Sequence, residues 1–481
     1  MNTNTAPSSA PSAAPLQRDA SQPLAHQLAQ RYAERIRQRL LLPGARLPSV
    51  RECARHHGVS PHTVVAAYDQ LQAEGLLEAR RQRGFFVRET RARQAAPALA
   101  GAAVPRQVPL DATTLIRGMF GTDTTRAPGS GVLPADWLDI GLLQSALRRA
   151  QAGSPDLHVA YGEPAGDARL RLALTRRLAD LGIQAGPEQL LTTAGATQAL
   201  DLITRGLLQP GDAVLVDDPG WAVEFARLAN SGMRLLPVPR HPDGGPDLAV
   251  MQRLAEAHHP RAYVTVSVLH NPTGSSLTAA QAHTILKLAD QHDLLIVEDD
   301  TYAFLAPEHT VRLSALDGLK RTIYVSGFSK FLSPAWRVGY LAASPERTQR
   351  LIDLKLLSNL TSNALPERAV AHVLDQGQLR RHAERVQQRL DAARTRSVAL
   401  AERAGARFVS PPRGLFGWID VGVDTERLAQ PLLDAGWLTA PGVLFSATRQ
   451  PGSLMRINFA TAQTAAFWRD LQRCVEALRG G

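Results

Sequence analysis

Apolar side chains near the N-terminus recur at the spacing of an amphipathic helix. One stripe runs from residue 24 to residue 40 and consists of Leu24, Leu28, Tyr32, Ile36 and Leu40. A period of three to four residues puts these side chains on one face of a helix. The pair Pro43-Gly44 follows, and both residues disfavour the continuation of a helix. The pattern predicts a first helix that ends before residue 43.

Two more helices are expected next, each opened by a serine. Ser49 and Glu52 have the spacing of a capping box, in which each side chain accepts a hydrogen bond from the other residue's backbone N–H. Ser60 precedes Pro61, which favours Ser as the N-cap and Pro as the first helical residue. Gly75 is expected to close this third helix. Its predicted inward face consists of Val64, Val65, Tyr68 and Leu71.

Two short strands, Leu76–Arg80 and Gly84–Arg88, are predicted after the helices, joined by an Arg-rich turn. Three helices followed by a hairpin are the parts of a winged helix-turn-helix. The phrase Leu42–Glu52, with the stretch Tyr68–Leu77 after it, closely resembles the GntR family of bacterial repressors.

In a winged helix-turn-helix, the N-terminal residues of the third helix lie near base edges in the major groove. The candidate base contacts are Ser60, His62 and Thr63. The candidate contacts to phosphate or to the minor groove are Arg51, Arg81 and Arg83. A winged helix that makes only protein contacts is the alternative interpretation.

Charge supports the DNA-binding interpretation of this region. The whole chain carries a formal net charge of +10, and residues 24–93 contain thirteen Arg against six acidic residues. A basic module is the electrostatic footprint of a nucleic-acid binder. A solvated, charged surface without a nucleic-acid partner is the simpler alternative.

Composition excludes several classes of protein. No apolar run approaches the roughly 18 residues that span a bilayer, and no signal-peptide pattern follows the N-terminus. Cys53 and Cys474 show no spacing pattern, which excludes a disulfide framework and a cysteine zinc site. We therefore expect a cytoplasmic protein with no metal site and no membrane association. Residues 1–22, which are rich in Ser, Ala, Pro and Thr, are expected to form a disordered tail.

The remainder of the chain alternates strand-like apolar runs with amphipathic stretches. The clearest runs are Ala213–Val216, Ala262–Val266 and Leu294–Val297. This alternation predicts an α/β fold with a mostly parallel sheet. The expected domains are a winged helix-turn-helix at 23–90, a linker rich in Ala, Pro, Gly and Arg at 91–132, and a body at 133–481, divided into a large subdomain at about 155–360 and a small one at about 361–481.

Polar motifs follow several of the predicted strands in the body. They are Gly195-Ala196-Thr197-Gln198, Asp217-Asp218-Pro219-Gly220-Trp221, Asn271-Pro272-Thr273-Gly274, Glu298-Asp299-Asp300-Thr301-Tyr302, Ser326-Gly327-Phe328-Ser329-Lys330 and Trp336-Arg337-Val338-Gly339-Tyr340. Pyridoxal 5′-phosphate requires an amine, a carboxylate for its pyridinium nitrogen, donors for the ring oxygen, a stacking aromatic and an anion site for its phosphate. Each motif alone also has an ordinary explanation as a helix start, a core aromatic or a solvated strand end. Arg456, inside the apolar strand Leu454–Phe459, needs an anionic partner if it is buried.

Taken together, these motifs resemble the fold-type I aminotransferases from about residue 133 to the end of the chain. The resemblance implies that Lys330 carries an aldimine with the cofactor and that Arg456 binds the α-carboxylate of an amino acid. The other implied cofactor contacts are Asp299 at the pyridinium nitrogen, Asn271 and Tyr302 at the ring oxygen, Trp221 on the ring face, Ala196, Thr197 and Arg337 at the phosphate, and Tyr161 reaching across a dimer interface to the neighbour's phosphate. One position departs from the family: Gly327 stands where Ser or Thr is frequent, and we expect Ser329 or a water to replace the missing hydroxyl.

A GntR-like reader joined to an aminotransferase-like body resembles the MocR group of bacterial regulators. This resemblance implies a head-to-tail homodimer that binds a double-stranded DNA operator and senses an amino acid, another amine or a B6 vitamer. Two other functions stay open: a working aminotransferase with an appended DNA-binding module, and a constitutive DNA binder with a vestigial body.

Overall fold

The computed structural model describes residues 22–37, 41, 43–80, 83–88, 117, 123–152, 155–241, 244–307 and 309–480. The chain divides into two compact units. The first comprises Met1–Ala127 together with Leu433–Leu438, and the second comprises Pro128–Leu432 and Thr439–Gly481. Each unit is described by itself below.

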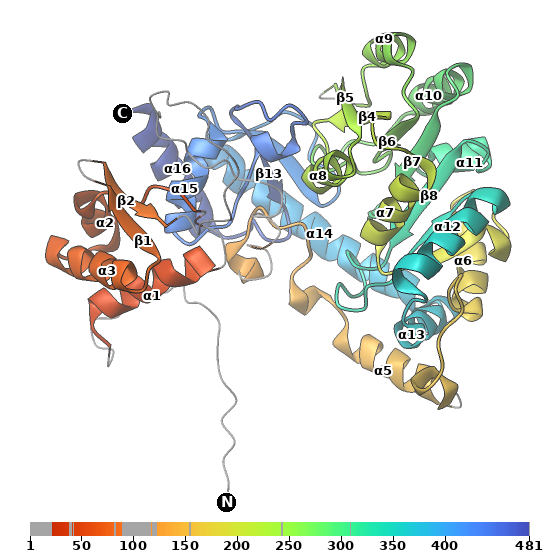
Figure 1. Cartoon of the computed structure of the whole chain (residues 1–481), viewed down its shortest axis with the longest axis horizontal. Helices are drawn as coiled ribbons and strands as arrows, with labels where there is room; N and C mark the ends of the chain where they lie inside the picture. The colour runs from red at the N-terminus through yellow and green to blue at the C-terminus, as the bar shows by residue number, and fades with distance from the viewer. Residues whose placement is uncertain are drawn as a thin grey trace, which may run out of the picture. The chain divides into compact units, whose positions relative to one another are not determined.

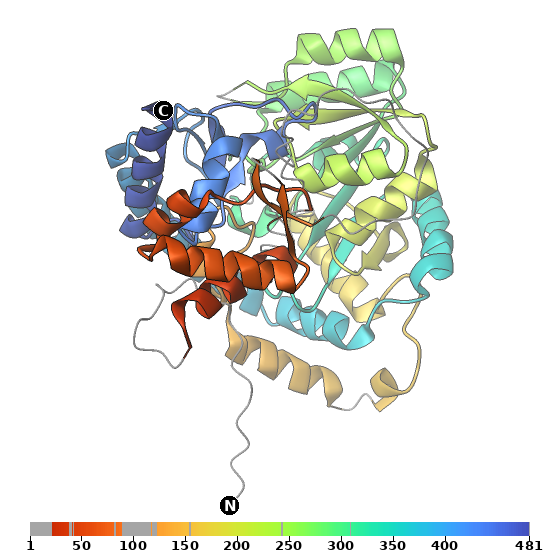
Figure 2. The same ribbon diagram turned by 60° about the vertical axis from the view of Figure 1, so that its left-hand side comes forward.

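The first unit contains three helices and a hairpin (Figure 2, red to orange). These elements are α1 (Leu24–Arg37), α2 (Val50–His57), α3 (Pro61–Ala73), β1 (Leu77–Arg80) and β2 (Gly84–Val87). The predicted caps are present: Ser49 and Glu52 form a complete capping box on α2, and the Ser60 side chain caps α3 with Pro61 in its first turn. β1 and β2 pair antiparallel, in the order expected of a winged helix-turn-helix.

One predicted core position of α3 differs. Val64, Tyr68 and Leu71 are fully buried, but Val65 is 40% exposed. Successive helical residues point about 100° apart, so Val65 lies at the edge of the stripe that its neighbours form. Leu40 of the α1 stripe and Arg81 of the hairpin tip lie outside the described residues.

The second unit is built on a seven-stranded sheet with the order β3-β9-β8-β7-β6-β4-β5 (Figure 1). The strands are β3 (Leu190–Thr193), β4 (Ala213–Asp218), β5 (Arg234–Pro239), β6 (Ala262–Thr265), β7 (Leu295–Asp299), β8 (Thr322–Gly327) and β9 (Gly339–Ala342). Strands β4 to β8 pair parallel with one another, whereas β9 is antiparallel to both of its neighbours. The prediction of a mostly parallel sheet is confirmed.

Helices cover both faces of this sheet, because alternate strand residues point to opposite sides. Val214 and Val216 of β4 belong to a core with residues of α7, α8 and α12, while Leu215 belongs to a second core with residues of α9, α10 and α11. The helices of the unit are α5 (Ile140–Gln151), α6 (Ala168–Asp180), α7 (Ala196–Leu207), α8 (Ala222–Asn230), α9 (Leu248–His258), α10 (Ala279–Gln291), α11 (Leu313–Asp317), α12 (Pro345–Asn359), α13 (Ala364–Asp375), α14 (Gln378–Arg403), α15 (Thr425–Asp434) and α16 (Ala465–Arg479).

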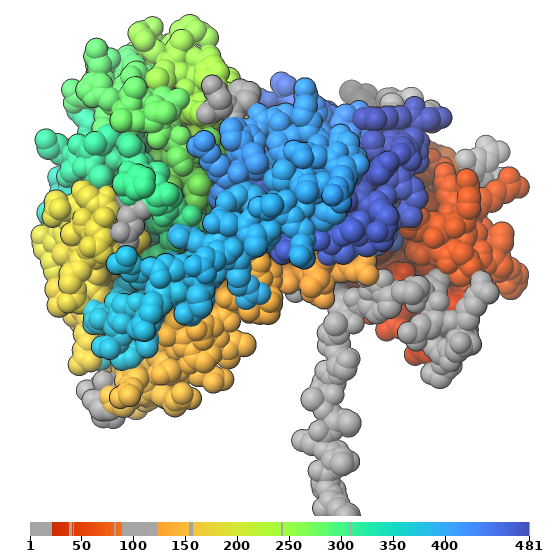
Figure 3. Space-filling model, turned by 180° about the vertical axis from the view of Figure 1, so that it is seen from behind, coloured from red at the N-terminus to blue at the C-terminus, as the bar shows by residue number. Residues whose placement is uncertain are grey.

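A second, smaller sheet lies in the C-terminal part of the chain and is antiparallel throughout. Its order is β10-β11-β13-β12, with β10 (Arg407–Phe408), β11 (Phe416–Asp420), β12 (Ala440–Pro441) and β13 (Leu454–Asn458). The long helix α14 leads into this sheet and crosses the face seen in Figure 3 as a light-blue band. Among the described residues, no helix is long and apolar enough to cross a membrane.

The last residues of the predicted linker are packed into the fold and do not form a linker. The residues from Ala127 to Gly131 are buried, and a short 3-10 helix, Thr124–Arg126, precedes them. Their composition offers little apolar surface, but their backbone carbonyls accept hydrogen bonds from Arg456 and Asn458 of β13. Hydrogen bonding, which composition does not reveal, fixes this stretch.

Candidate functional site

The carboxyl ends of the central parallel strands bring the predicted site residues to one edge of the large sheet. Asp299 is the last residue of β7, Asn271 lies in the loop after β6, and Lys330 lies in the loop after β8. This edge is where ligands of open α/β sheets bind. The site is thus assembled by the parallel topology, from residues that are distant in sequence.

The Lys330 amine lies among charged groups that act on its proton. Burial, together with the positive charges of Arg456 and Arg337, lowers its pKa to about 8, and the negative charge of Asp299 opposes them. Lys355 provides a contrast: its pKa is also lowered to about 8 by burial, but its amine donates to the carbonyls of Pro164 and Thr192, at 3.0 and 2.9 Å. Among the described residues no hydrogen-bond partner is found for Lys330. Its amine is therefore available for chemistry, whereas that of Lys355 is committed to the fold.

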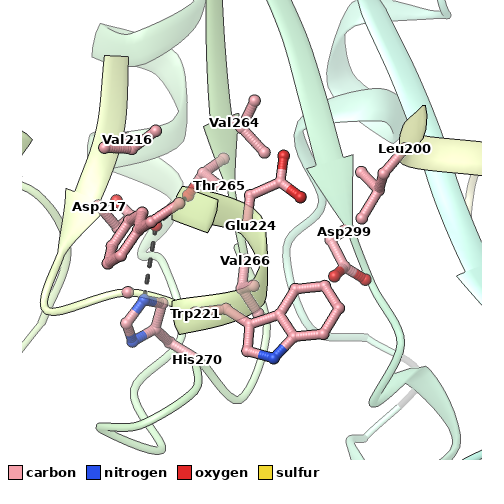
Figure 4. A pocket seen from close by; sticks show the side chains of 12 residues that line it. Leu200, Val216, Asp217, Trp221, Glu224, Val264, Thr265, Val266, His270 and Asp299 are labelled. Atoms are coloured by element: carbon pink, nitrogen blue, oxygen red, sulfur yellow. Dashed lines mark hydrogen bonds and ion pairs between the residues drawn. The ribbon is translucent and has the colours of Figure 1, made fainter. Parts of the chain in front are cut away.

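Asp299 and Trp221 line the same pocket, which is shown close up in Figure 4. Burial raises the pKa of the Asp299 carboxyl to about 6, and hydrogen bonds from the backbone N–H and the hydroxyl of Thr301 oppose this rise. Glu224, one turn after Trp221, lines this pocket too, and its negative charge also raises the pKa of Asp299. Arg227 forms an ion pair with Glu224. A protonated ring nitrogen at Asp299 would favour the ionised carboxylate.

Asn271 and Tyr302 lie within hydrogen-bond distance of each other. Burial raises the pKa of Tyr302, and a hydrogen bond with the Asn271 side chain opposes the rise. The Asn271 Oδ1 accepts a hydrogen bond of 2.9 Å from Arg456 Nη1. The hydroxyl and the amide are the kinds of group that hold a phenolic ring oxygen, which is the role predicted for them.

The groups predicted to bind phosphate converge at the N-terminus of α7. Arg337 Nη1 donates to Ser329 Oγ at 2.9 Å, and Nη2 donates to the carbonyl of Ala194 at 3.1 Å. Gly195 has a φ of 84°, and a Cβ there would lie 2.4 Å from Arg337 Nη2. The first N–H groups of a helix have no partner inside the helix, so those of Ala196 and Thr197 can bind an anion. A guanidinium, a hydroxyl and a helix N-terminus thus form one anion cradle.

Gly327, the departure noted in the sequence, lies directly beside this cradle. A Cβ at this position would lie 3.2 Å from both the Gly339 Cα and the Val338 carbonyl oxygen. The backbone at Val338 and Gly339 therefore leaves little room for a side chain at this position. The contact between Ser329 and Arg337 supports the expectation that Ser329 supplies a hydroxyl near the phosphate.

Arg456 is buried, with only 3% of its surface exposed, beneath the rings of Phe416 and Phe445. Burial lowers its pKa to about 10. In the part of the chain that the structure describes, no carboxylate forms an ion pair with it, and its Nε is buried without a hydrogen-bond partner. The described residues therefore do not supply the anionic partner that a buried arginine requires, and a ligand could supply it.

A buried network in the wall of the same pocket was not predicted from the sequence. The Asp217 carboxylate accepts hydrogen bonds from Tyr263 and Thr265, at 2.6 and 2.7 Å, and pairs with Arg240 at 3.0 Å. His270, which precedes Asn271, lies 3.5 Å from the same carboxylate (Figure 4, dashed line). Burial holds the pKa of His270 well below its usual value, so the ring is neutral. The network anchors the loop that carries Asn271. Asp217, in the motif that contains Trp221, was the only one of its members that the sequence analysis had singled out.

Tyr161 is 84% exposed and lines a surface cleft together with Arg337 and Ala194. Within its own chain it is therefore near the cradle but uncovered. Among the described residues, no group of His, Cys, Asp and Glu side chains could hold a metal ion.

On the first unit, Arg51, His62 and Arg83 are exposed, as base or phosphate contacts must be. Ser60 and Thr63 are partly committed to the helix cap: Ser60 Oγ accepts from the Thr63 N–H at 3.1 Å and lies 2.8 Å from its hydroxyl. His62, by contrast, is exposed and takes no part in the cap.

Two family profiles match the chain. The profile described as aminotransferase class I and II matches residues 129–471, and that of the bacterial regulatory proteins of the gntR family matches residues 24–87. An uncharacterized HTH-type transcriptional regulator, YdfD of Bacillus subtilis, is 27% identical over 90% of this chain and 91% of its own length. The probable rhizopine catabolism regulatory protein MocR of Rhizobium meliloti is 29% identical over 82% of this chain and 80% of its own.

Among solved structures, the α-aminoadipate aminotransferase LysN of Thermus thermophilus, in complex with N-(5′-phosphopyridoxyl)-L-leucine, superposes with a TM-score of 0.70. It is 25% identical, and the match covers 76% of this chain and 95% of that one.

Proposed function

Because this chain belongs to the aminotransferase class I and II family and also carries a gntR-family DNA-binding domain, we propose that it is a transcription regulator controlled by ligands of its aminotransferase-like body. The sensed ligand is an amino compound or a B6 vitamer. The observation that carries the proposal is the convergence on Lys330 of Asp299, Arg337 and Arg456, from three separate segments of the chain.

Pyridoxal 5′-phosphate is the cofactor of this fold, as the pyridoxyl complex of LysN illustrates. When bound, it supplies an aldehyde that links to an amine and a ring that accepts electrons. The residues proposed to hold it are Lys330 as the attachment point, together with Ala196, Thr197, Trp221, Asn271, Asp299, Tyr302, Ser329 and Arg337. The anion cradle and the buried carboxylate fit its phosphate and its ring nitrogen.

The protein's own groups set the protonation and orientation of a ligand. With a pKa of about 8, Lys330 is unprotonated in a useful fraction near neutral pH and can act as a nucleophile. Asp299, in its ionised form, would hold a proton on a ring nitrogen. The Arg456 guanidinium would hold an α-carboxylate.

In the DNA-binding unit, His62, with Ser60 and Thr63, is proposed to contact base edges. Arg51, Arg81 and Arg83 are proposed to contact phosphate or the minor groove. We further propose a head-to-tail homodimer in which Tyr161 contacts the neighbour's cofactor. Its 84% exposure beside the Arg337 cleft supports that role, since nothing described in its own chain covers it.

A second candidate, a working aminotransferase, is favoured by one comparison. A 2-aminoadipate transaminase of Thermus thermophilus is 29% identical over 61% of this chain. Turnover of amino-acid and keto-acid pairs by the purified protein would establish it.

The test of the regulator begins with the visible absorption spectrum of the purified protein. B6 vitamers and single amino acids are then titrated while binding to an operator, selected from random DNA, is followed by fluorescence anisotropy. We expect a cofactor band and a change in operator affinity with at least one amine. A protein without the band, or with operator affinity insensitive to every amine and vitamer, would contradict the proposal.

A further inference from the structure

The backbone carbonyl of Gly129 accepts a hydrogen bond from the buried guanidinium of Arg456. Arg456 Nη2 donates a hydrogen bond of 2.6 Å to the carbonyl of Gly129, and Nη1 donates to Asn271. The two residues of the first contact are 327 positions apart in the chain. The contact therefore ties the start of the body to the candidate carboxylate site.

The neighbouring residue Asn458 holds the same backbone segment in place. Its N–H donates to the Pro128 carbonyl at 2.8 Å, and its Nδ2 donates to the carbonyls of Ser130 and Val132, at 3.0 and 2.8 Å. Arg456 and Asn458 are two residues apart on β13, so their side chains project from the same face. The side chains of Arg456 and Asn458 thus bind three carbonyls of the segment, and the Asn458 backbone N–H binds a fourth.

The fit at Gly129 is close. A Cβ added there would lie 2.4 Å from the backbone N of Ala440 and from the carbonyl carbon of Thr439. Only a residue without a side chain lets the carbonyl reach Arg456 along this path. The segment is packed against the small sheet rather than passing over it.

The Gly129 carbonyl is a weak partner for this cation. It brings a partial charge, whereas the buried guanidinium has no carboxylate partner among the described residues and keeps an unbonded Nε. A carboxylate would bring a full negative charge and could accept two parallel hydrogen bonds from the guanidinium, whereas the carbonyl accepts one with a partial charge only. A carboxylate ligand would therefore compete successfully for the same N–H groups.

We propose that the Gly129 carbonyl occupies the position of a ligand carboxylate, and that a carboxylate-bearing ligand displaces this carbonyl from Arg456 and so loosens the segment Pro128–Val132. This inference rests on the function proposed above. Because residue 128 directly continues the chain that comes from the DNA-binding domain, displacement of Gly129 loosens the end of that domain's tether nearest the body. Ligand binding and the state of the tether are then coupled through one shared guanidinium, because the ligand favours the released state only.

The test compares two ligands that differ only in the carboxylate. The full-length protein, stripped of cofactor, is loaded with N-(5′-phosphopyridoxyl)-L-leucine or with its counterpart without the carboxylate, N-(5′-phosphopyridoxyl)-3-methylbutylamine. Hydrogen–deuterium exchange is then followed by mass spectrometry in peptides that cover residues 123–134, with α10 peptides as the internal reference. We expect the leucine conjugate to speed exchange at Gly129–Val132 by about tenfold or more relative to the amine conjugate, with no difference in α10.

An Arg456→Met variant serves as the second measurement. In this variant the two conjugates should give the same, fast exchange at residues 129–132, because neither finds the guanidinium. If both conjugates bind the unmodified protein and leave the segment equally protected, the coupling is wrong, while the proposed cofactor site stands. If neither conjugate binds, the proposed function itself fails, and this inference falls with it.

Discussion

In the DNA-binding unit the candidate contact residues lie on the surface, whereas the body gathers buried groups from distant segments into one site. Arg51 and His62 are exposed, and each belongs to a helix whose caps lie within a few residues of it. Arg456, in contrast, is 3% exposed and binds residues 185 and 327 positions away. Substitutions at the surface should therefore have graded and separable effects, whereas those in the body should have large and specific ones.

The largest effect is expected at Lys330. Lys330→Ala should abolish covalent attachment of the cofactor, because no other described amine shares this site, while the other contacts still bind it noncovalently. Borohydride reduction followed by mass spectrometry measures the attachment, and thermal unfolding checks that the fold persists. A variant that still carries a borohydride-fixed cofactor would overturn the assignment of Lys330.

Arg456→Ala should come next. It should leave the cofactor band unchanged but weaken the binding of amino acids by about 2–4 kcal/mol, the cost of a lost charge-assisted contact in a buried site. Spectrophotometric titration with amino acids and with the corresponding decarboxylated amines separates the carboxylate from the rest of the ligand. Equal affinity of variant and parent for amino acids would point instead to a ligand without an α-carboxylate.

A smaller effect is expected on the DNA-binding surface. His62→Ala should cost about 1–3 kcal/mol on the operator and little on scrambled DNA. Arg51→Ala, the matched surface change, should weaken binding to both DNAs alike and reduce the salt slope by about one unit. Anisotropy titrations over a salt series measure both. If His62→Ala weakened binding to the two DNAs equally, α3 would not be the base-contacting element, and the wing would be the better candidate.

The smallest effect concerns the stability of the DNA-binding unit towards acid. Burial lowers the pKa of His57 from 6.5 to about 4. The unfolded chain therefore takes up a proton that the folded unit excludes, so stability is complete above about pH 6.5 and falls as the pH decreases towards 4. Because the ring is partly solvated, we expect a loss of about 1–2 kcal/mol.

Thermal unfolding of the full chain at pH 7.5 and pH 5 tests this expectation. His57→Gln should flatten the pH dependence, whereas His62→Gln, which changes an exposed imidazole, should leave it intact. A pH dependence unaffected by His57→Gln would assign the proton uptake to another group.

The same contrast explains what the sequence could predict. Helix caps such as Ser49 with Glu52 depend on neighbouring residues, so local pattern located them to the residue. The alternation of strands and helices predicted the parallel sheet, because a crossover connection is itself a sequence pattern. The positions of Asp299 and Lys330 could be assigned from motifs, because strand ends mark the ligand-binding edge.

Other features could not be predicted because they depend on long-range contacts. The exposure of Val65 depends on where the edge of the core falls, which periodicity alone does not fix. The ordering of Gly129 depends on carbonyl contacts with β13, and composition carries no record of them. It was also not predicted from the sequence that Glu224 lines the same pocket as Asp299. Its position three residues after Trp221, at helical spacing, could have indicated this.

The antiparallel strand β9 has a consequence for how the protein folds. β3 and β9 pair residues 190–193 with residues 339–342, and Gly339 packs its backbone against the turn Gly195-Ala196 at the start of α7. Contacts of such long sequence separation form slowly, because the entropy of closing a large loop is lost before the contacts stabilise the chain. The anion cradle is therefore complete only when this sheet edge closes, late in folding. During refolding, the gain of cofactor fluorescence or absorbance should lag behind the recovery of helical signal, which makes the cofactor a reporter of the last long-range pairing.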